Sequence, residues 1–77
     1  MKKIIILAGN GLLPINIINI LVKKRINFCS LIISDKGWDK NLEKYDYKII
    51  NIGKVLTELI KLKKLGYNSL IMAGSIP

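Results

Sequence analysis

Apolar residues along this chain fall into two kinds of segment, unbroken runs and stretches with helical spacing. The unbroken runs are typical of strands that are buried on both faces of a parallel sheet. The stretches with helical spacing lie between some of these runs and predict amphipathic helices. Strands are predicted over about residues 3–8, 27–34, 48–52 and 69–73, and helices over about residues 14–24 and 54–65.

The most informative turn follows the first apolar run, where Gly9 and Gly11 bracket Asn10 and Pro14 comes shortly after. Glycine permits backbone conformations and close approaches that a side chain would block. Proline has no N–H to lose and a preset φ, so it fits the first turn of a helix. The turn is therefore predicted to present free backbone N–H groups at a positive helix end, which favours phosphate or another anion. A tight turn without a ligand is the alternative, because Pro14 stands where a dinucleotide fingerprint needs its third glycine.

The two predicted helices differ in how their apolar residues are arranged. In residues 14–24 the apolar positions wrap more than one face, which predicts a helix buried on two sides. In residues 54–65 they form a single stripe, which predicts a helix with one buried face and one solvated face. The stripe consists of Val55, Leu56, Leu59, Ile60 and Leu62, and the outward positions are Lys54, Glu58, Lys61 and Lys64.

Residues 35–47 are the least apolar section of the chain. Asp35 ends the second predicted strand, where an acid either caps the loop or holds a ribose in a nucleotide-binding fold. Asp39 is placed to cap one short helical turn that runs through Glu43. The aromatic residues of this section either cover the sheet edge or form a surface for a partner, and they are Trp38, Tyr45 and Tyr47.

The order of the predicted elements defines the fold class. Two β-α-β units in succession imply an α/β protein, a Rossmann-like three-layer structure with a parallel sheet of about four strands and two main helices. With the usual strand order 3-2-1-4, the first and fourth strands are neighbours at a topological switch point, where ligands bind. The loops after these two strands both begin with Ala-Gly. The predicted substrate-binding residues are therefore Gly9, Asn10, Gly11, Leu12, Ala73, Gly74 and Ser75.

Composition bounds the function classes. The chain has 77 residues, enough for one small domain, and 51% of them are hydrophobic, which suggests apolar surface left for a partner. The net charge is +8, but the lysines are spread along the sequence without interleaved aromatic residues, so nucleic acid is not the expected partner. The absence of histidine excludes catalysis or metal binding by histidine within this chain. The single cysteine, Cys29, lies in an apolar run and is predicted to be a core residue.

Four short motifs, in order along the chain, resemble a known family. They are similar to the Ala-Gly-x-Gly-x-Leu-Pro opening, the Leu-Gly-x-Leu/Val segment, a Leu-Gly pair and the Met-Ala-Gly strand end of the LpxI-type UDP-2,3-diacylglucosamine pyrophosphatases of lipid A biosynthesis. The resemblance is to the N-terminal domain of that family and covers essentially all 77 residues. The matching segments are Leu7–Pro14, Ile52–Val55, Leu65–Gly66 and Met72–Gly74.

The resemblance implies a hydrolase of Gram-negative bacteria that cleaves UDP-2,3-diacylglucosamine to UMP and 2,3-diacylglucosamine 1-phosphate with Mg²⁺. In the family a larger C-terminal domain carries the catalytic acid, and here the sequence stops at Pro77 without the basic residue that usually lies near the closing motif. Residues 1–77 are thus expected to be a single Rossmann-like N-terminal domain that is inactive alone. Neither catalytic residues nor metal ligands are assigned to it. A split gene, a remnant and an incomplete chain all remain open.

The expected partners follow from the same resemblance. They are the lipid-linked UDP-sugar substrate and the catalytic domain, as a separate chain or a missing part, with a homodimer as a further option. The expected location is the cytoplasm, with peripheral contact at the inner membrane. A nucleotide- or dinucleotide-binding Rossmann module and a small interaction protein are the alternative functions.

Overall fold

The computed structural model describes residues 2–77 and contains one sheet of four parallel strands. The strand order is β3-β2-β1-β4, which confirms the predicted order 3-2-1-4. The register sets Ala8 of β1 beside Ile32 of β2 and Ala73 of β4, so these three strands end at one common edge. The strands are β1 (Lys3–Ala8), β2 (Asn27–Ile32), β3 (Tyr47–Ile49) and β4 (Ser69–Ala73).

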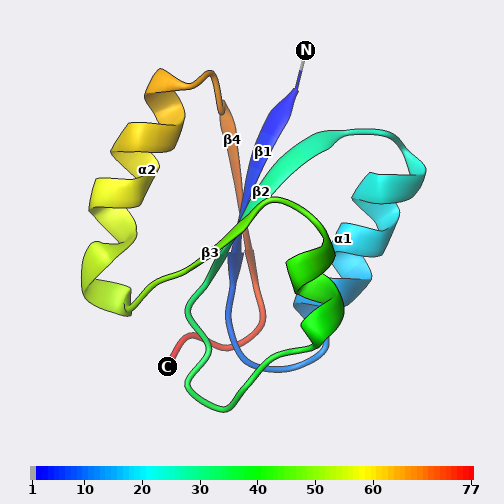
Figure 1. Cartoon of the computed structure of the whole chain (residues 1–77), viewed down its shortest axis with the longest axis vertical. Coiled ribbons are helices and arrows are strands. Elements are labelled where there is room, and N and C mark those ends of the chain that lie inside the picture. Colours follow the sequence, from blue (N-terminus) through cyan, green and yellow to red (C-terminus); the bar gives the residue numbers. More distant parts are fainter. Residues whose placement is uncertain (1) are drawn as a thin grey trace.

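Helices cover both faces of this sheet and produce the three predicted layers (Figure 1). Helix α1 (Leu13–Lys23) connects β1 to β2, and Pro14 stands in its first turn as predicted. Helix α2 (Val55–Lys64) connects β3 to β4 on the opposite face. Two short 3-10 helices, η1 (Lys40–Lys44) and η2 (Ile52–Lys54), complete the chain. Within the described part of the chain, no helix is long and apolar enough to cross a membrane.

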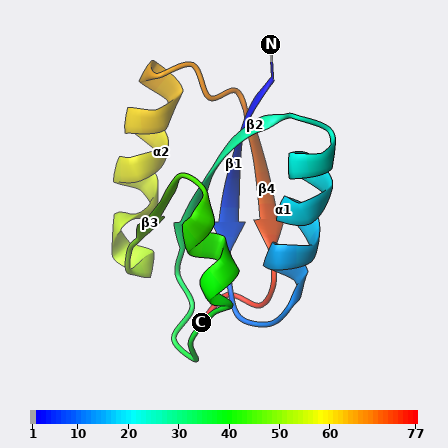
Figure 2. The same cartoon turned by 45° about the vertical axis from the view of Figure 1, so that its right-hand side comes forward.

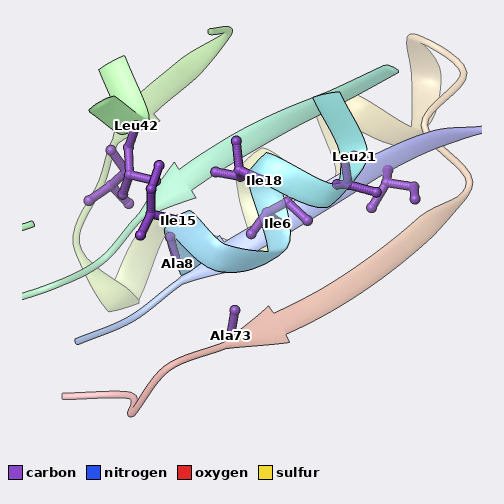
Figure 3. Packing of buried hydrophobic residues seen from close by; sticks show 9 residues of the cluster. Ile6, Ala8, Ile15, Ile18, Leu21, Leu42 and Ala73 are labelled. Atoms are coloured by element: carbon purple, nitrogen blue, oxygen red, sulfur yellow. The ribbon is translucent and has the colours of Figure 1, made fainter. Parts of the chain in front are cut away.

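The core consists of two apolar clusters, one on each face of the sheet. On the α1 face, the alternate residues of β1 pack with the inner side of α1 and with Leu42 of η1 (Figure 3). On the α2 face, the other residues of β1 pack with Leu62 of α2 and with Cys29, whose predicted core position is confirmed. This double burial explains why the first strand is an unbroken apolar run. The α1 cluster comprises Ile4, Ile6, Ala8, Ile15, Ile18, Leu21, Ile32, Leu42 and Ala73.

The two helices are less buried than their sequences predict. Helix α1 buries a single stripe against the sheet and leaves Ile20 53% exposed, so the prediction of burial on two sides is wrong. The reason is that no second layer covers α1 within residues 2–77. In α2, Leu56 and Ile60 lie outside the buried stripe, whereas Glu58, predicted to face outward, keeps only 12% of its side chain exposed.

The third strand is shorter than predicted, because its partner ends. Strand β3 pairs with β2 only as far as Ile49 opposite Ile32, where β2 itself stops. One more hydrogen bond joins the N–H of Ile50 to the carbonyl of Ile32, and the chain then turns into η2. The predicted short helical turn after β2 is confirmed, because the carboxylate of Asp39 accepts the N–H of Asn41 at 2.8 Å at the start of η1.

Candidate functional site

The two Ala-Gly loops meet at the carboxyl ends of β1 and β4. The N–H of Gly9 donates to the carbonyl of Ala73 at 2.8 Å. Asn10 and Ser75 then form a two-way backbone bridge, with N···O distances of 2.8 Å from Asn10 to Ser75 and 3.1 Å in return. Five of the predicted site residues, Gly9, Asn10, Ala73, Gly74 and Ser75, are therefore brought together by the main chain itself.

This contact explains the glycine after each alanine. A Cβ on Gly9 would lie 2.3 Å from the carbonyl oxygen of Ser75, and a Cβ on Gly74 would lie 2.3 Å from the carbonyl oxygen of Asn10. Gly74 also has a φ of +83°, a backbone conformation that residues with a side chain rarely adopt. Each loop therefore needs its glycine so that the other loop can approach. The repeated dipeptide serves the contact between the two loops.

The side chain of Asn10 adds a third loop to this site. Its amide nitrogen donates to Asp35 Oδ1 at 2.9 Å, and its carbonyl oxygen accepts the hydroxyl of Ser34 and the N–H of Lys36, the latter at 3.3 Å. The Ser34 hydroxyl also contacts the carbonyl of Gly37. Sequence reasoning placed Asn10 in the site but missed Ser34. The available signal was the position of Ser34, since the carboxyl ends of neighbouring parallel strands share one edge.

The loop contact reduces the set of free backbone donors. The prediction of a turn with free N–H groups is wrong for Gly9 and Asn10, because the β4 loop accepts both. Among the described residues, the N–H groups of Gly11, Leu12 and Leu13 have no partner within the protein, and no side chain caps the start of α1. Gly11 has a φ of +100°, and a Cβ added to it would meet no atom within 4 Å. The remaining donors thus stand just outside the contact between the loops.

Apolar side chains lie beside these donors. Leu12 is 71% exposed and Leu13 is 50% exposed at the start of α1. Ile76, which follows the Asn10–Ser75 bridge, is 38% exposed. The edge of the sheet therefore combines unpartnered backbone N–H groups with exposed aliphatic side chains. This combination suits an anion that carries an apolar group.

Metal-binding and titratable groups do not gather here. Across residues 2–77, no three His, Cys, Asp or Glu residues stand close enough to hold a metal ion. The groups with shifted pKa values belong to other parts of the fold. Burial raises the pKa of Cys29 in the core, and the indole of Trp38 lowers the pKa of Glu43 by hydrogen bonding to its carboxylate. The acids of residues 2–77 therefore do not fit Mg²⁺ by themselves.

The comparison with protein families gives a match that spans nearly the whole chain. The sequence model of the LpxI N-terminal domain matches residues 3–77. No curated protein and no solved structure matches the chain.

Proposed function

The chain belongs to the family of LpxI N-terminal domains, and we propose from this membership that it is the substrate-binding part of a UDP-2,3-diacylglucosamine hydrolase. The family match links the chain to lipid A biosynthesis. The observation that carries the proposal is the extent of this match, which includes all three loops of the candidate site.

The backbone around α1 supports a phosphate-binding role. The start of a helix carries a partial positive charge, and its first N–H groups have no partner within the helix. Here Leu12 and Leu13 carry such N–H groups at the helix start, and the unpartnered N–H of Gly11 lies directly before them. The hydrogen bonds of Asn10 to the β2 loop and its bridge to Ser75 hold the turn in place from both sides. A phosphate would therefore meet donors that are already ordered.

The apolar surface at the same edge favours a lipid-linked phosphate over a simple nucleotide. The exposed side chains of Leu12, Leu13 and Ile76 offer contacts for acyl chains next to the donors. In the proposed substrate, two acyl chains are attached to the sugar that bears the phosphate. The product 2,3-diacylglucosamine 1-phosphate contains both features and is the smallest ligand that would use the whole edge.

The chemical step needs metal-holding groups in addition to those of residues 2–77. Hydrolysis of a pyrophosphate with Mg²⁺ requires carboxylates that hold the metal and donors that orient the phosphates. Residues 2–77 offer such donors, but no cluster of carboxylates fits the metal. We therefore assign no catalytic residue here and propose that a further domain or a partner chain supplies the metal ligands. Either a separate chain or a covalently attached domain would satisfy this requirement.

One observation keeps a nucleotide-binding function as the second candidate. Asp35 follows β2, the position at which an acid holds the ribose in dinucleotide-binding folds. Its Oδ1 accepts the amide of Asn10 at 2.9 Å, so only part of the carboxylate is left for a ribose. If this function were the correct one, NAD would bind and Asp35→Ala would abolish that binding.

Ligand-observed NMR of the purified chain with 2,3-diacylglucosamine 1-phosphate, UMP and NAD tests the proposal. We expect the lipid phosphate to bind and Gly11→Ala to weaken it. Gly66→Ala is the matched control, because Gly66 has a φ of +96° but lies at the opposite edge of the sheet. Both variants carry the same backbone strain, so only a loss specific to Gly11 places the ligand at the turn. Preferential NAD binding, or equal loss in both variants, would refute the proposed site.

A second experiment addresses the reaction. The chain is mixed with, or fused to, the C-terminal domain of an LpxI-family protein, and UMP release from UDP-2,3-diacylglucosamine is measured with and without Mg²⁺. The proposal predicts metal-dependent release only when both parts are present. A fusion that folds but releases no UMP would contradict the assignment to this reaction.

A further inference from the structure

Most of the positive charge of this chain lies at the edge of the sheet opposite the candidate site. The amino ends of β1 and β4 are at this edge, together with the C-terminal ends of α1 and α2 (Figures 1 and 2). Seven of the chain's thirteen cations are found here and carry +7, so the other six cations and the five acids sum to only +1. The seven are Lys2, Lys3, Lys23, Lys24, Arg25, Lys63 and Lys64, and together they are called the basic edge.

Contacts between the segments confirm that the basic edge is one continuous region. The N–H of Asn68, which precedes β4, donates to the carbonyl of Lys3 at 3.0 Å. The ammonium group of Lys3 donates to the carbonyl of Leu65 at 2.8 Å, at the end of α2. The same register places Lys3 beside Asn27 of β2, just after the cations that end α1. The start of β1 and the ends of α1 and α2 are far apart in sequence, but their cations thus lie at the same edge of the sheet.

Among residues 2–77, the acids form no ion pair with the seven cations of the basic edge. The ion pairs join Lys40 to Glu43 and Lys48 and Lys61 to Glu58. Lys61 also stands in the last turn of α2 but is paired with Glu58, so it is not counted in the basic edge. The remaining acids include Asp46, which lies beside the middle of β2, where its carbonyl accepts the N–H of Ser30. Such a concentration of one charge produces a local field that attracts anionic surfaces.

Apolar surface is interspersed among these cations. Leu65, at the end of α2, is 65% exposed. It directly follows Lys64, and its carbonyl accepts the ammonium of Lys3. Next to it opens a groove of about 250 Å³ between α2 and β4. The walls of this groove are largely aliphatic, and Lys63 lies in its lining. The groove is lined by Ile5, Leu59, Lys63, Tyr67, Asn68, Ser69 and Leu70.

We propose that the basic edge docks on the surface of a bilayer that contains anionic phospholipids. The lysines contact lipid phosphates, while Leu65 and the groove beside it receive apolar parts of the lipids. Cations that surround exposed aliphatic groups are the usual composition of surfaces that bind in the plane of a membrane interface. Single-stranded nucleic acid fits less well, because it needs free aromatic faces, and the ring of Tyr67 is covered by the ammonium of Lys3 at 4.6 Å.

This inference does not depend on the proposed function. The basic edge and the candidate site lie at opposite ends of the strands and share no residue. Variants at one edge leave the other intact, so failure of either proposal is recognised separately.

Flotation with lipid vesicles tests the docking. We expect the protein to float with vesicles of equal parts phosphatidylcholine and phosphatidylglycerol and to stay behind with pure phosphatidylcholine. A cation near an anionic surface contributes about fivefold to the binding constant, so replacing three should weaken binding about a hundredfold. The variant is Lys23→Gln, Lys24→Gln and Lys64→Gln, and its matched control is Lys36→Gln, Lys44→Gln and Lys54→Gln, which removes the same charge elsewhere.

The outcomes separate the proposal from its competitors. Loss in the first triple variant with retention in the control supports docking through the basic edge. Equal loss in both would show an effect of net charge alone and would overturn it, as would equal binding to neutral vesicles or tighter binding to a single-stranded oligonucleotide than to the anionic vesicles.

A second pair of variants tests the apolar part. Leu65→Asn should reduce vesicle binding by a few fold, whereas Leu56→Asn, at the other end of the same helix and 70% exposed, should not. Equal binding by both variants would remove Leu65 from the docking surface.

Discussion

The contact between the β1 and β4 loops makes a strong prediction for Gly9→Ala. The added Cβ would lie 2.3 Å from the carbonyl oxygen of Ser75 and 2.8 Å from its carbonyl carbon. Because both are main-chain atoms, no side chain can rotate away to make room. The two loops must separate by roughly 1 Å to reach ordinary van der Waals contact. A shift of that size breaks both hydrogen bonds of the bridge between Asn10 and Ser75.

The size of the effect follows from these losses. Each of the two hydrogen bonds contributes about 1 kcal/mol, and the forced rearrangement costs about 1–3 kcal/mol. These terms sum to at least about 3 kcal/mol, which is the loss in the free energy of unfolding that we expect for Gly9→Ala. For a domain of this size, that is a large part of the total stability and lowers the melting temperature by roughly 15 °C.

Thermal and urea unfolding, followed by circular dichroism, measure this change. Gly53→Ala is the matched control, because its nearest new contact is Asn51 Oδ1 at 3.4 Å and its φ is not positive. The control should be neutral, or stabilising by about 0.5 kcal/mol, through its effect on the unfolded chain. If the two variants have the same stability within about 0.5 kcal/mol, the reasoning about the loop contact is refuted.

Two further predictions concern titratable groups. Hydrogen bonding from Lys48, together with the charges of Lys48 and Lys61, lowers the pKa of Glu58 in the folded protein. The ionised Glu58 carboxylate therefore stabilises the fold at pH values above its unfolded pKa, and this stabilisation is lost as the pH falls through its folded pKa. Glu58→Gln should therefore melt below the wild type at neutral pH, with a gap that closes below roughly pH 4, whereas a gap independent of pH would contradict this cause. Burial raises the pKa of the Cys29 thiol, so the native protein should react slowly with a thiol reagent at neutral pH and rapidly in denaturant, and fast reaction of the native protein would show that the core opens.

Local sequence patterns predicted most of the fold because they depend on short-range physics. The bounds of β1 and β4 and the role of Pro14 follow from apolar runs and backbone restrictions within a few residues. The predictions that failed concern features that depend on residues far away in the sequence. β3 stops at Ile49 because β2 stops, and the outer side of α1 is exposed because no further layer covers it within residues 2–77.

The sequence predicted the position of the candidate site but not its hydrogen bonds. Strand order alone implied that the two Ala-Gly loops are neighbours, and the structure bears this out. The sequence did not reveal that Gly9 and Asn10 use their N–H groups to join the loops. It also did not reveal that Asn10 links Ser34 and Asp35 into the site. Such hydrogen bonds depend on the exact register of strands that are far apart along the chain.

The sequence by itself determined the elements, the strand order and the family resemblance, since each depends on residue type and spacing along the chain. Only the tertiary structure decided which groups remain available. It joined the two glycine loops through their main chains, and it gathered cations that are scattered in sequence onto one edge. The physical reason is that, in a fold of parallel strands joined by helices, every loop lies either at the carboxyl ends or at the amino ends of the strands. The edge at which a charged or hydrogen-bonding residue lies therefore depends on the direction of the chain, and a local sequence pattern does not reveal which residues meet there.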